Sequence, residues 1–274
     1  MRSILLGLVF AAAIFLVEDV HAAGDIPFEF RDGLIWVKVE TPARSFNFVL
    51  DSGAGASVVN LQTAASLGLK MGRALSVLGV DSQMPARYAD GFAGRVGGVP
   101  VNGSMLAIDL GEASRSCGRR IDGLIGVDWF REKVVEIDFR RKTIRLVERP
   151  QTSAEGGSLP IIDRNGAFCV PVGVNGRKPC WVRLDTGCNT ALQFVVDRRT
   201  ASAWLRTSIG LAASSGRLAC GEVQLGDKRL DGVKIALHER EIFPGESGLL
   251  GTGILSKFRV TIDLRANRLF LDRN

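Results

Sequence analysis

Two aspartates in the chain are each followed by a hydroxyl residue and a glycine. Asp51-Ser52-Gly53 comes directly after the apolar run Phe48-Val49-Leu50, and Asp185-Thr186-Gly187 comes directly after Val182-Arg183-Leu184. One such triplet is a weak signal, but two copies after equivalent strand-like runs are a specific one. Two carboxylates that face each other within a few ångströms cannot both ionise, so they share one proton and titrate as a coupled pair.

A shared proton gives the pair a defined chemistry. One carboxylate acts as the base that activates a water molecule, and its protonated partner donates to the oxygen on which charge develops. Gly53 and Gly187 let the chain turn sharply and bring backbone amides close to the carboxylates. Ser52 and Thr186 supply hydroxyls that can hold the two loops together. This chemistry needs no metal and no cofactor.

The elements around the triplets occur twice in the chain. A strand, a turn and a second strand precede each triplet, and the separation from Gly123 to Asp138 equals that from Gly248 to Asp263. Short segments rich in Val, Ile and Phe alternate with turn residues, which predicts an all-β fold of two similar barrel-like lobes. A few short helices are expected, at residues 61–67, 128–132, 199–205 and 254–257.

The two copies and the N-terminus predict the domain organisation. Residues 1–22 have a basic start, a short apolar core and small residues at the end, which is typical of a secretory signal. We therefore expect an exported protein, periplasmic or extracellular, with no stable membrane insertion after cleavage. Residues 149–158 are rich in turn-forming residues and suit a connection. They divide the chain into lobes at residues 23–150 and 151–274.

Charge and cysteine content limit the partners. The formal net charge of +6 becomes +7 when Arg2, Glu18 and Asp19 leave with the signal. The basic residues are scattered and not interleaved with aromatics, so we expect no nucleic-acid partner. The one histidine that remains after removal of the signal, His238, and the dispersed cysteines give no zinc-ligand spacing. Cys169 and Cys180 flank a turn and are candidates for a disulfide. A monomer is expected.

These motifs resemble those of the pepsin and retropepsin group of aspartic peptidases, particularly small bacterial members similar to two fused retropepsin subunits. The first triplet continues into Ala54-Gly55-Ala56-Ser57-Val58-Val59, and apolar-apolar-Gly motifs follow at Leu124-Ile125-Gly126 and Leu249-Leu250-Gly251. The resemblance implies catalytic roles for Asp51 and Asp185, with Ser52, Gly53, Thr186 and Gly187 in support. It covers nearly the whole chain after the signal.

The resemblance also implies how a substrate binds. An extended polypeptide would add as a strand beneath β-hairpin flaps. The first flap is expected at residues 78–98 and contains the candidate substrate-binding residues Gly79, Tyr88 and Gly91. The second flap is expected around residues 210–220.

Other interpretations remain open at this stage. The same fold could bind peptides without cutting them. Cys188, in the second loop, could serve a thiol mechanism with His238 as base, although His238 lies in a charged stretch and is expected to be exposed. Asp138 and Asp263 are expected to be structural hairpin residues. Asp122 and Glu246 do not match in register and are expected to be solvated.

Overall fold

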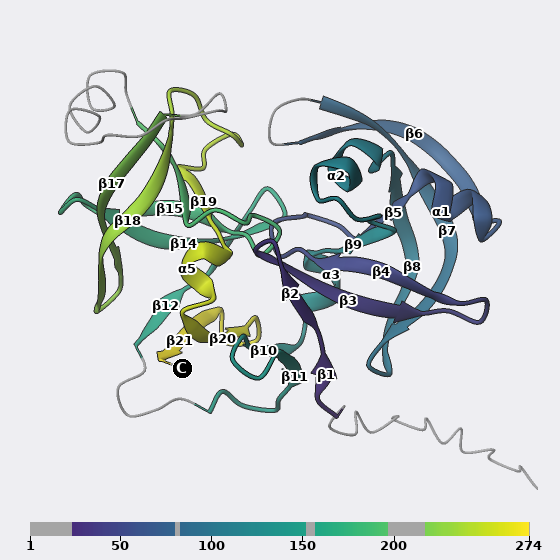
Figure 1. The fold of residues 1–274 in the computed structure, drawn as a ribbon, viewed down its shortest axis with the longest axis horizontal. Coiled ribbons are helices and arrows are strands. Elements are labelled where there is room, and N and C mark those ends of the chain that lie inside the picture. Colours follow the sequence, from purple (N-terminus) through teal and green to yellow (C-terminus); the bar gives the residue numbers. More distant parts are fainter. Residues whose placement is uncertain (1–23, 80–82, 152–156, 197–216, 274) are drawn as a thin grey trace, which may run out of the picture.

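The computed structural model describes residues 24–79, 83–151, 157–196 and 217–273. The predicted signal at residues 1–22 and the predicted helix at 199–205 lie outside this range. Within the described residues the chain is mainly β with short helices, in two lobes, as the sequence predicts (Figure 1). No helix in these residues is long and apolar enough to span a membrane.

The first lobe is built on an eight-stranded sheet. Its order is β2-β3-β4-β9-β5-β8-β7-β6, and β3 also pairs with β7 through Glu40 and Arg95, so the sheet curls back on itself. The strands are β2 (Glu29–Arg31), β3 (Leu34–Glu40), β4 (Ser45–Leu50), β5 (Val58–Asn60), β6 (Lys70–Leu78), β7 (Gln83–Val96), β8 (Val99–Ile108) and β9 (Gly123–Ile125).

The second lobe has a seven-stranded sheet of the same kind. Its order is β13-β14-β15-β19-β16-β18-β17, and a further pairing of β14 with β17 curls it back in the same way. The strands are β13 (Ile162–Arg164), β14 (Ala167–Val174), β15 (Cys180–Leu184), β16 (Leu192–Val195), β17 (Arg217–Leu225), β18 (Lys228–His238) and β19 (Gly248–Leu250).

A six-stranded sheet joins the two halves below the junction of the lobes (Figure 1). Its order is β1-β11-β10-β20-β21-β12, so β10 of one half pairs with β20 of the other. The strands are β1 (Ile26–Pro27), β10 (Val134–Asp138), β11 (Thr143–Leu146), β12 (Ser158–Pro160), β20 (Phe258–Asp263) and β21 (Arg268–Arg273). Each half thus contributes three strands. The division of the chain at residue 150 stays a prediction.

Asp138 and Asp263 end equivalent strands of this sheet. The Asp138 carboxylate accepts from the amide of Arg141 at 2.8 Å, and the Asp263 carboxylate accepts from the amides of Arg265 and Ala266 at 3.0 and 2.9 Å. These bonds fix the turns that follow the strands. The predicted structural role of both residues is confirmed.

The described helices are short and lie between strands. They are α1 (Leu61–Ser66), α2 (Gly111–Ser116), α3 (Val127–Phe130) and α5 (Thr252–Leu255). The expected helices at 128–132 and 254–257 begin one or two residues earlier than predicted. The sequence did not predict α2, because Leu110 at its N-cap offers no side-chain acceptor of the kind that marks a helix start.

The candidate disulfide between Cys169 and Cys180 is wrong. In the β14–β15 hairpin Cys169 lies opposite Arg183, and Cys180 lies opposite Val172. The two cysteines are therefore displaced by three positions, about 10 Å along the strand. None of the five cysteines, all of which the structure describes, forms a disulfide. The prediction was wrong because it assumed a hairpin register that puts the two cysteines opposite each other. The turn between the strands sets a different register.

Candidate active site

The two Asp-hydroxyl-Gly loops start from equivalent pairs of strands. β4 runs parallel to β9 with Leu50 opposite Ile125, and β15 runs parallel to β19 with Leu184 opposite Leu250. The amide of Asp51 donates to the Ile125 carbonyl at 2.9 Å, and that of Asp185 donates to the Leu250 carbonyl at 3.0 Å. The apolar-apolar-Gly motifs therefore fix the base of each loop.

The glycine that ends each motif packs directly behind a loop. A Cβ atom on Gly126 would lie 2.4 Å from the carbonyl carbon of Ala56, and one on Gly251 would lie 2.2 Å from the Thr190 carbonyl oxygen. Both distances are too short for a side chain, so backbone packs on backbone at these points. This close packing holds each loop against its own lobe.

Ser52 and Thr186 join the two loops by reciprocal hydrogen bonds. The Ser52 hydroxyl donates to the Leu184 carbonyl at 2.8 Å, and the Thr186 hydroxyl donates to the Leu50 carbonyl at 2.7 Å. The amide of Ser52 donates to the Thr186 hydroxyl at 2.9 Å, and the amide of Thr186 donates to the Ser52 hydroxyl at 3.1 Å. Both side chains are fully buried. Each loop is thus held by the strand end of the other lobe.

This arrangement brings the two aspartates together. A Cβ atom on Gly53 would lie 2.4 Å from Cγ of Asp185, and one on Gly187 would lie 2.5 Å from Cγ of Asp51. Each glycine is therefore in contact with the carboxyl group of the opposite triplet. The two carboxyl groups are therefore close enough to influence each other's titration. The structure brings together all six residues of the two triplets.

The surroundings raise the pKa of both carboxyls, and unequally. Burial raises the pKa of Asp51, while the amides of Gly53 and Ala54, which donate to its Oδ1 at 2.9 and 3.0 Å, act in the opposite direction. Burial and then the negative charge of Asp51 raise the pKa of Asp185 well above its usual range. Within the described residues Asp185 accepts one loop amide, that of Gly187 at 2.9 Å. Asp51 is therefore the better placed of the two to carry the charge.

Cys188 lies in the second loop, where polar but non-basic groups contact its thiol. Its sulfur lies 3.1 Å from the Thr190 hydroxyl and 3.4 Å from the Gln193 amide nitrogen. Burial, and then the carboxylate of Asp185, raise the pKa of the Cys188 thiol, so the thiolate is disfavoured. His238 is half-buried rather than exposed and ends β18 opposite Val195. This geometry does not favour the thiol mechanism.

Sequence reasoning missed a buried ion pair next to the site. Arg183 and Glu246 form a two-point contact, and both are almost completely buried. Glu246 was expected to be solvated, and so was Asp122, which is buried and accepts from Thr63 and Arg120. Both expectations are wrong. The signal that could have found the pair is Arg183 itself, a charged residue inside an apolar strand.

The predicted first flap at residues 78–98 comprises the end of β6, the strand β7 and the turn that leads to β8, apart from residues 80–82, which lie outside the described residues. β6 and β7 form a hairpin that pairs from Lys70 with Asp90 to Leu78 with Gln83. Gly79 follows β6, and Tyr88 is partly exposed in β7 opposite Leu106. Gly91 lies at a bulge of β7 with a φ of 89°, which favours glycine. Substrate-binding roles for these residues stay predictions. Residues 210–216 of the second predicted flap lie outside the described residues, and 217–220 belong to β17.

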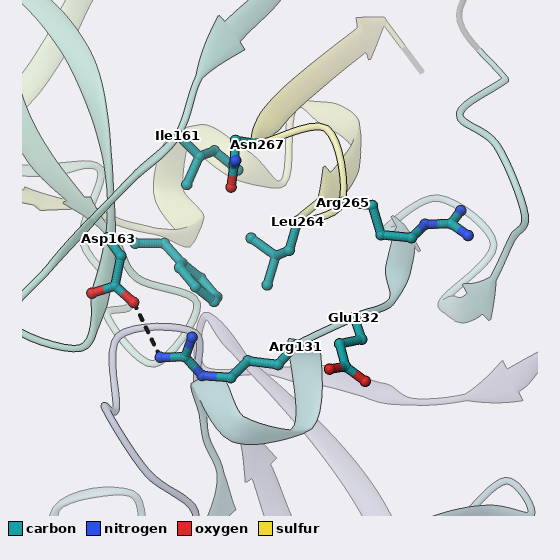
Figure 2. Close-up of a pocket in the computed structure, with 8 residues that line it drawn as sticks. Arg131, Glu132, Ile161, Asp163, Leu264, Arg265 and Asn267 are labelled. Atoms are coloured by element: carbon teal, nitrogen blue, oxygen red, sulfur yellow. Dashed lines mark hydrogen bonds and ion pairs between the residues drawn. The ribbon is translucent and has the colours of Figure 1, made fainter.

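A cavity of about 440 Å³ lies away from the aspartate pair. Figure 2 shows it between segments of both halves, with Arg131 paired to Asp163 at 3.1 Å across it. Its lining residues are Arg131, Glu132, Ile161, Asp163, Phe168, Leu264, Arg265 and Asn267. Neither Asp51 nor Asp185 lines it. Among the described residues no group of three or more His, Cys, Asp or Glu side chains is arranged to hold a metal ion.

Comparison with known proteins agrees with this geometry. Residues 37–129 match the family model described as aspartyl protease, a stretch that contains the first triplet and the Leu124-Ile125-Gly126 motif. No curated protein matches the chain. The family match supports the resemblance to retropepsin-type aspartic peptidases and, in general terms, an aspartic protease function.

Proposed function

We propose that the protein is an aspartic endopeptidase that hydrolyses peptide bonds with Asp51 and Asp185. The observation that carries the proposal is the reciprocal hydrogen bonding of Ser52 and Thr186, which holds the two carboxyls face to face across the lobe junction. Such a pair shares one proton, as the chemistry requires. The proposal includes an exported, monomeric protein and an extended polypeptide substrate bound beneath the β6–β7 hairpin.

The unequal surroundings of the two carboxyls suggest their roles. Asp51, whose charged form accepts two backbone amides, is the base that takes a proton from water. Asp185, whose pKa is raised further, keeps the shared proton and donates it to the carbonyl oxygen of the peptide bond. When the intermediate collapses, Asp51 gives the proton that it took from water to the leaving amine nitrogen and the C–N bond breaks. Asp185 regains a proton from a hydroxyl of the intermediate, so the pair returns to its starting protonation state.

The test is cleavage of a denatured protein mixture by the purified protein at several pH values. We expect fragments, and we expect a peptide inhibitor that carries a hydroxyl mimic of the tetrahedral intermediate to abolish them. Asp51→Asn and Asp185→Asn should each lower the rate by about 1,000-fold or more, because each removes half of the acid–base pair. Asp231→Asn is the matched control, since its side chain is 79% exposed on the second lobe.

Two results would contradict the proposal in different ways. Near-normal turnover by either pair variant would refute the shared-proton mechanism. A wild-type protein that binds the inhibitor or an extended peptide but yields no fragments at any pH would instead identify a peptide-binding protein on the same fold.

A further inference from the structure

Arg183 links the second lobe to the catalytic loop of the first. Its Nε and Nη2 donate to the two carboxylate oxygens of Glu246 at 2.7 and 2.5 Å. Its Nη1 donates across the lobe junction to the Gly53 carbonyl at 2.8 Å. The ring of Phe243 covers the guanidinium, with 3.5 Å from its carbon to the ring centroid. The guanidinium is therefore held by neighbours on several sides.

The bond to Gly53 couples Arg183 to the carboxyl of Asp51. The amide of Gly53 donates to Asp51 Oδ1, while its carbonyl accepts from Arg183. Gly53 also touches the Asp185 carboxyl. A shift of the guanidinium would therefore move a residue that contacts both catalytic carboxyls.

The fold alone does not explain a buried ion pair at this place. The side chains of Arg183 and Glu246 are only 8% and 1% exposed. Burying two charges carries a desolvation cost that an apolar pair avoids, and replacing such a pair by apolar residues is often neutral or stabilising. In the first half the equivalent position is Val49, which packs in an apolar cluster. The charge of Arg183 is therefore explained by a role at the aspartate pair rather than by a contribution to folding.

Arg183 is also the cation that acts on both carboxyls. Its positive charge lowers the pKa of Asp51 and that of Asp185, against the effect of burial. Besides Arg183 and the two carboxyls, the titratable groups around the pair in the described structure are Cys188 and Glu246. Cys188 lies in the second loop, and the guanidinium binds Glu246 directly. Burial raises the pKa of the Cys188 thiol and keeps it neutral, so Arg183 supplies the positive charge.

We infer that Arg183 is a positioning residue for the aspartate pair: it holds the Gly53 loop across the lobe junction and sets the pH range in which the two carboxyls share one proton. The inference rests on the proposed function for its rate measurements. Arg183 does not contact the reacting atoms, because it acts through Gly53 and through its charge.

The test replaces the ion pair in the full-length protein as it is exported. Arg183→Met/Glu246→Met removes both charges without leaving either one buried alone, so the protein should fold. Because the cation favours the ionised carboxylates, its loss should move both limbs of the pH profile of kcat/KM to higher pH, by about one pH unit. The rate at the new optimum should fall by about tenfold as the Gly53 loop loosens.

Arg183→Lys keeps the positive charge but removes the planar guanidinium group. A lysine keeps the cation but cannot bind Glu246 at two points and Gly53 at a third. We expect pH limbs within about 0.3 units of the wild type and a kcat/KM about tenfold lower. If the double variant does not fold, this variant alone decides the positioning role, and wild-type kcat/KM in Arg183→Lys would overturn it.

Arg120→Met is the matched control. Arg120 pairs with the buried Asp122 in the first half but contacts neither catalytic loop in the described structure. Its pH profile should equal that of the wild type. Unchanged pH limbs in a folded Arg183→Met/Glu246→Met protein would overturn the inference while leaving the proposed function intact.

A second measurement does not depend on cleavage. The ¹³C chemical shifts of the Asp51 and Asp185 carboxyl carbons report their titration directly. They should titrate at higher pH in the double variant than in the wild type, and equal titrations would overturn the inference. If the wild type proves unable to cleave, the proposed function fails, but this titration still decides whether Arg183 tunes the pair.

Discussion

The strand that leads to Asp51 carries Val49, whereas the strand that leads to Asp185 carries Arg183 at the same place. Both residues are buried, but Val49 packs in an apolar cluster of the first lobe and Arg183 binds Glu246 and Gly53. The backbone of the two loops is nevertheless held in the same way. The duplicated halves thus share their backbone hydrogen bonds and differ in the electrostatics behind each carboxyl.

The supports behind the two loops differ in the same manner. In the first half the Asp128 carboxylate accepts from the amide and the hydroxyl of Ser57 at 2.7 and 2.8 Å. In the second half the Thr252 hydroxyl lies 2.5 Å from the Gly33 carbonyl and 3.0 Å from the Cys188 carbonyl. The bonds between Ser57 and Asp128 therefore stay within the first half, whereas the Thr252 hydroxyl also reaches Gly33 of the other half. This difference makes the halves unequal partners around a symmetric centre.

The largest effect on stability is expected when a charge is placed in the first half at the position equivalent to Arg183. Val49→Arg would bury a cation in a cluster whose described members are apolar, without a counterpart of Glu246. We expect a loss of about 3–5 kcal/mol in the free energy of unfolding, measured by urea denaturation. Val49→Ile should cost less than about 1.5 kcal/mol. Equal stability of the two variants would mean that the first lobe can accommodate a charge as the second does.

The hydrogen bonds that join the loops should respond alike in both halves. Ser52→Ala and Thr186→Val each leave a buried amide and a buried carbonyl without a partner. Each should lower the free energy of unfolding by about 2–4 kcal/mol. Thr186→Ser keeps the hydroxyl and is the control, with most of the stability retained. A large effect in only one of the two halves would contradict the symmetry of the centre.

The two triplet glycines, Gly53 and Gly187, provide a further test of the symmetry between the two loops. A methyl group at Gly53 or Gly187 would lie 2.4 or 2.5 Å from the carboxyl carbon of the opposite aspartate. Because the carboxyls would have to separate, Gly53→Ala and Gly187→Ala should each lower kcat/KM by about 100-fold. Gly24→Ala is a control for activity, since Gly24 has no positive φ and, apart from its chain neighbours, no atom of the described chain lies within 4 Å of its added methyl. A triplet variant with wild-type kcat/KM would show that the carboxyls need no such contact.

The unequal pKa values predict a pH-dependent stability difference. The pKa of Asp185 is raised on folding, so its contribution to stability is fully present below the usual aspartate pKa of about 3.9 and is lost as the pH rises through the raised value. The amide introduced by Asp185→Asn does not titrate. The stability of the wild type relative to this variant should therefore fall by up to about 1.4 kcal/mol per pH unit in that window. Parallel urea-denaturation curves across the window would contradict the raised pKa.

The smallest effect is expected at Cys188, whose counterpart in the first loop is Ala54. Cys188→Ala should keep kcat/KM within about threefold of the wild type, because the thiol takes no part in proton transfer. Cys220→Ala, at an exposed position of β17, is the control. Loss of cleavage in Cys188→Ala alone would revive the thiol mechanism.

The sequence by itself predicted the features that depend on local pattern. The two triplets, the strands before them, the apolar-apolar-Gly motifs and the hairpin residues Asp138 and Asp263 all lie where the duplication placed them. These features could be predicted because each is encoded within a short stretch of chain, and because the second copy repeats the first. An all-β fold followed from the same short-range pattern.

Only the tertiary structure decided which polar side chains are buried and what they contact. Arg183 and Glu246 are 63 residues apart and meet only after β15 pairs with β19. Glu246 and Asp122 looked solvated because a charge in a turn is normally exposed, and Cys169 and Cys180 looked close because the hairpin register was not known. Burial and register arise from contacts between distant segments, so the electrostatics of the aspartate pair could not be predicted from the spacing of its motifs.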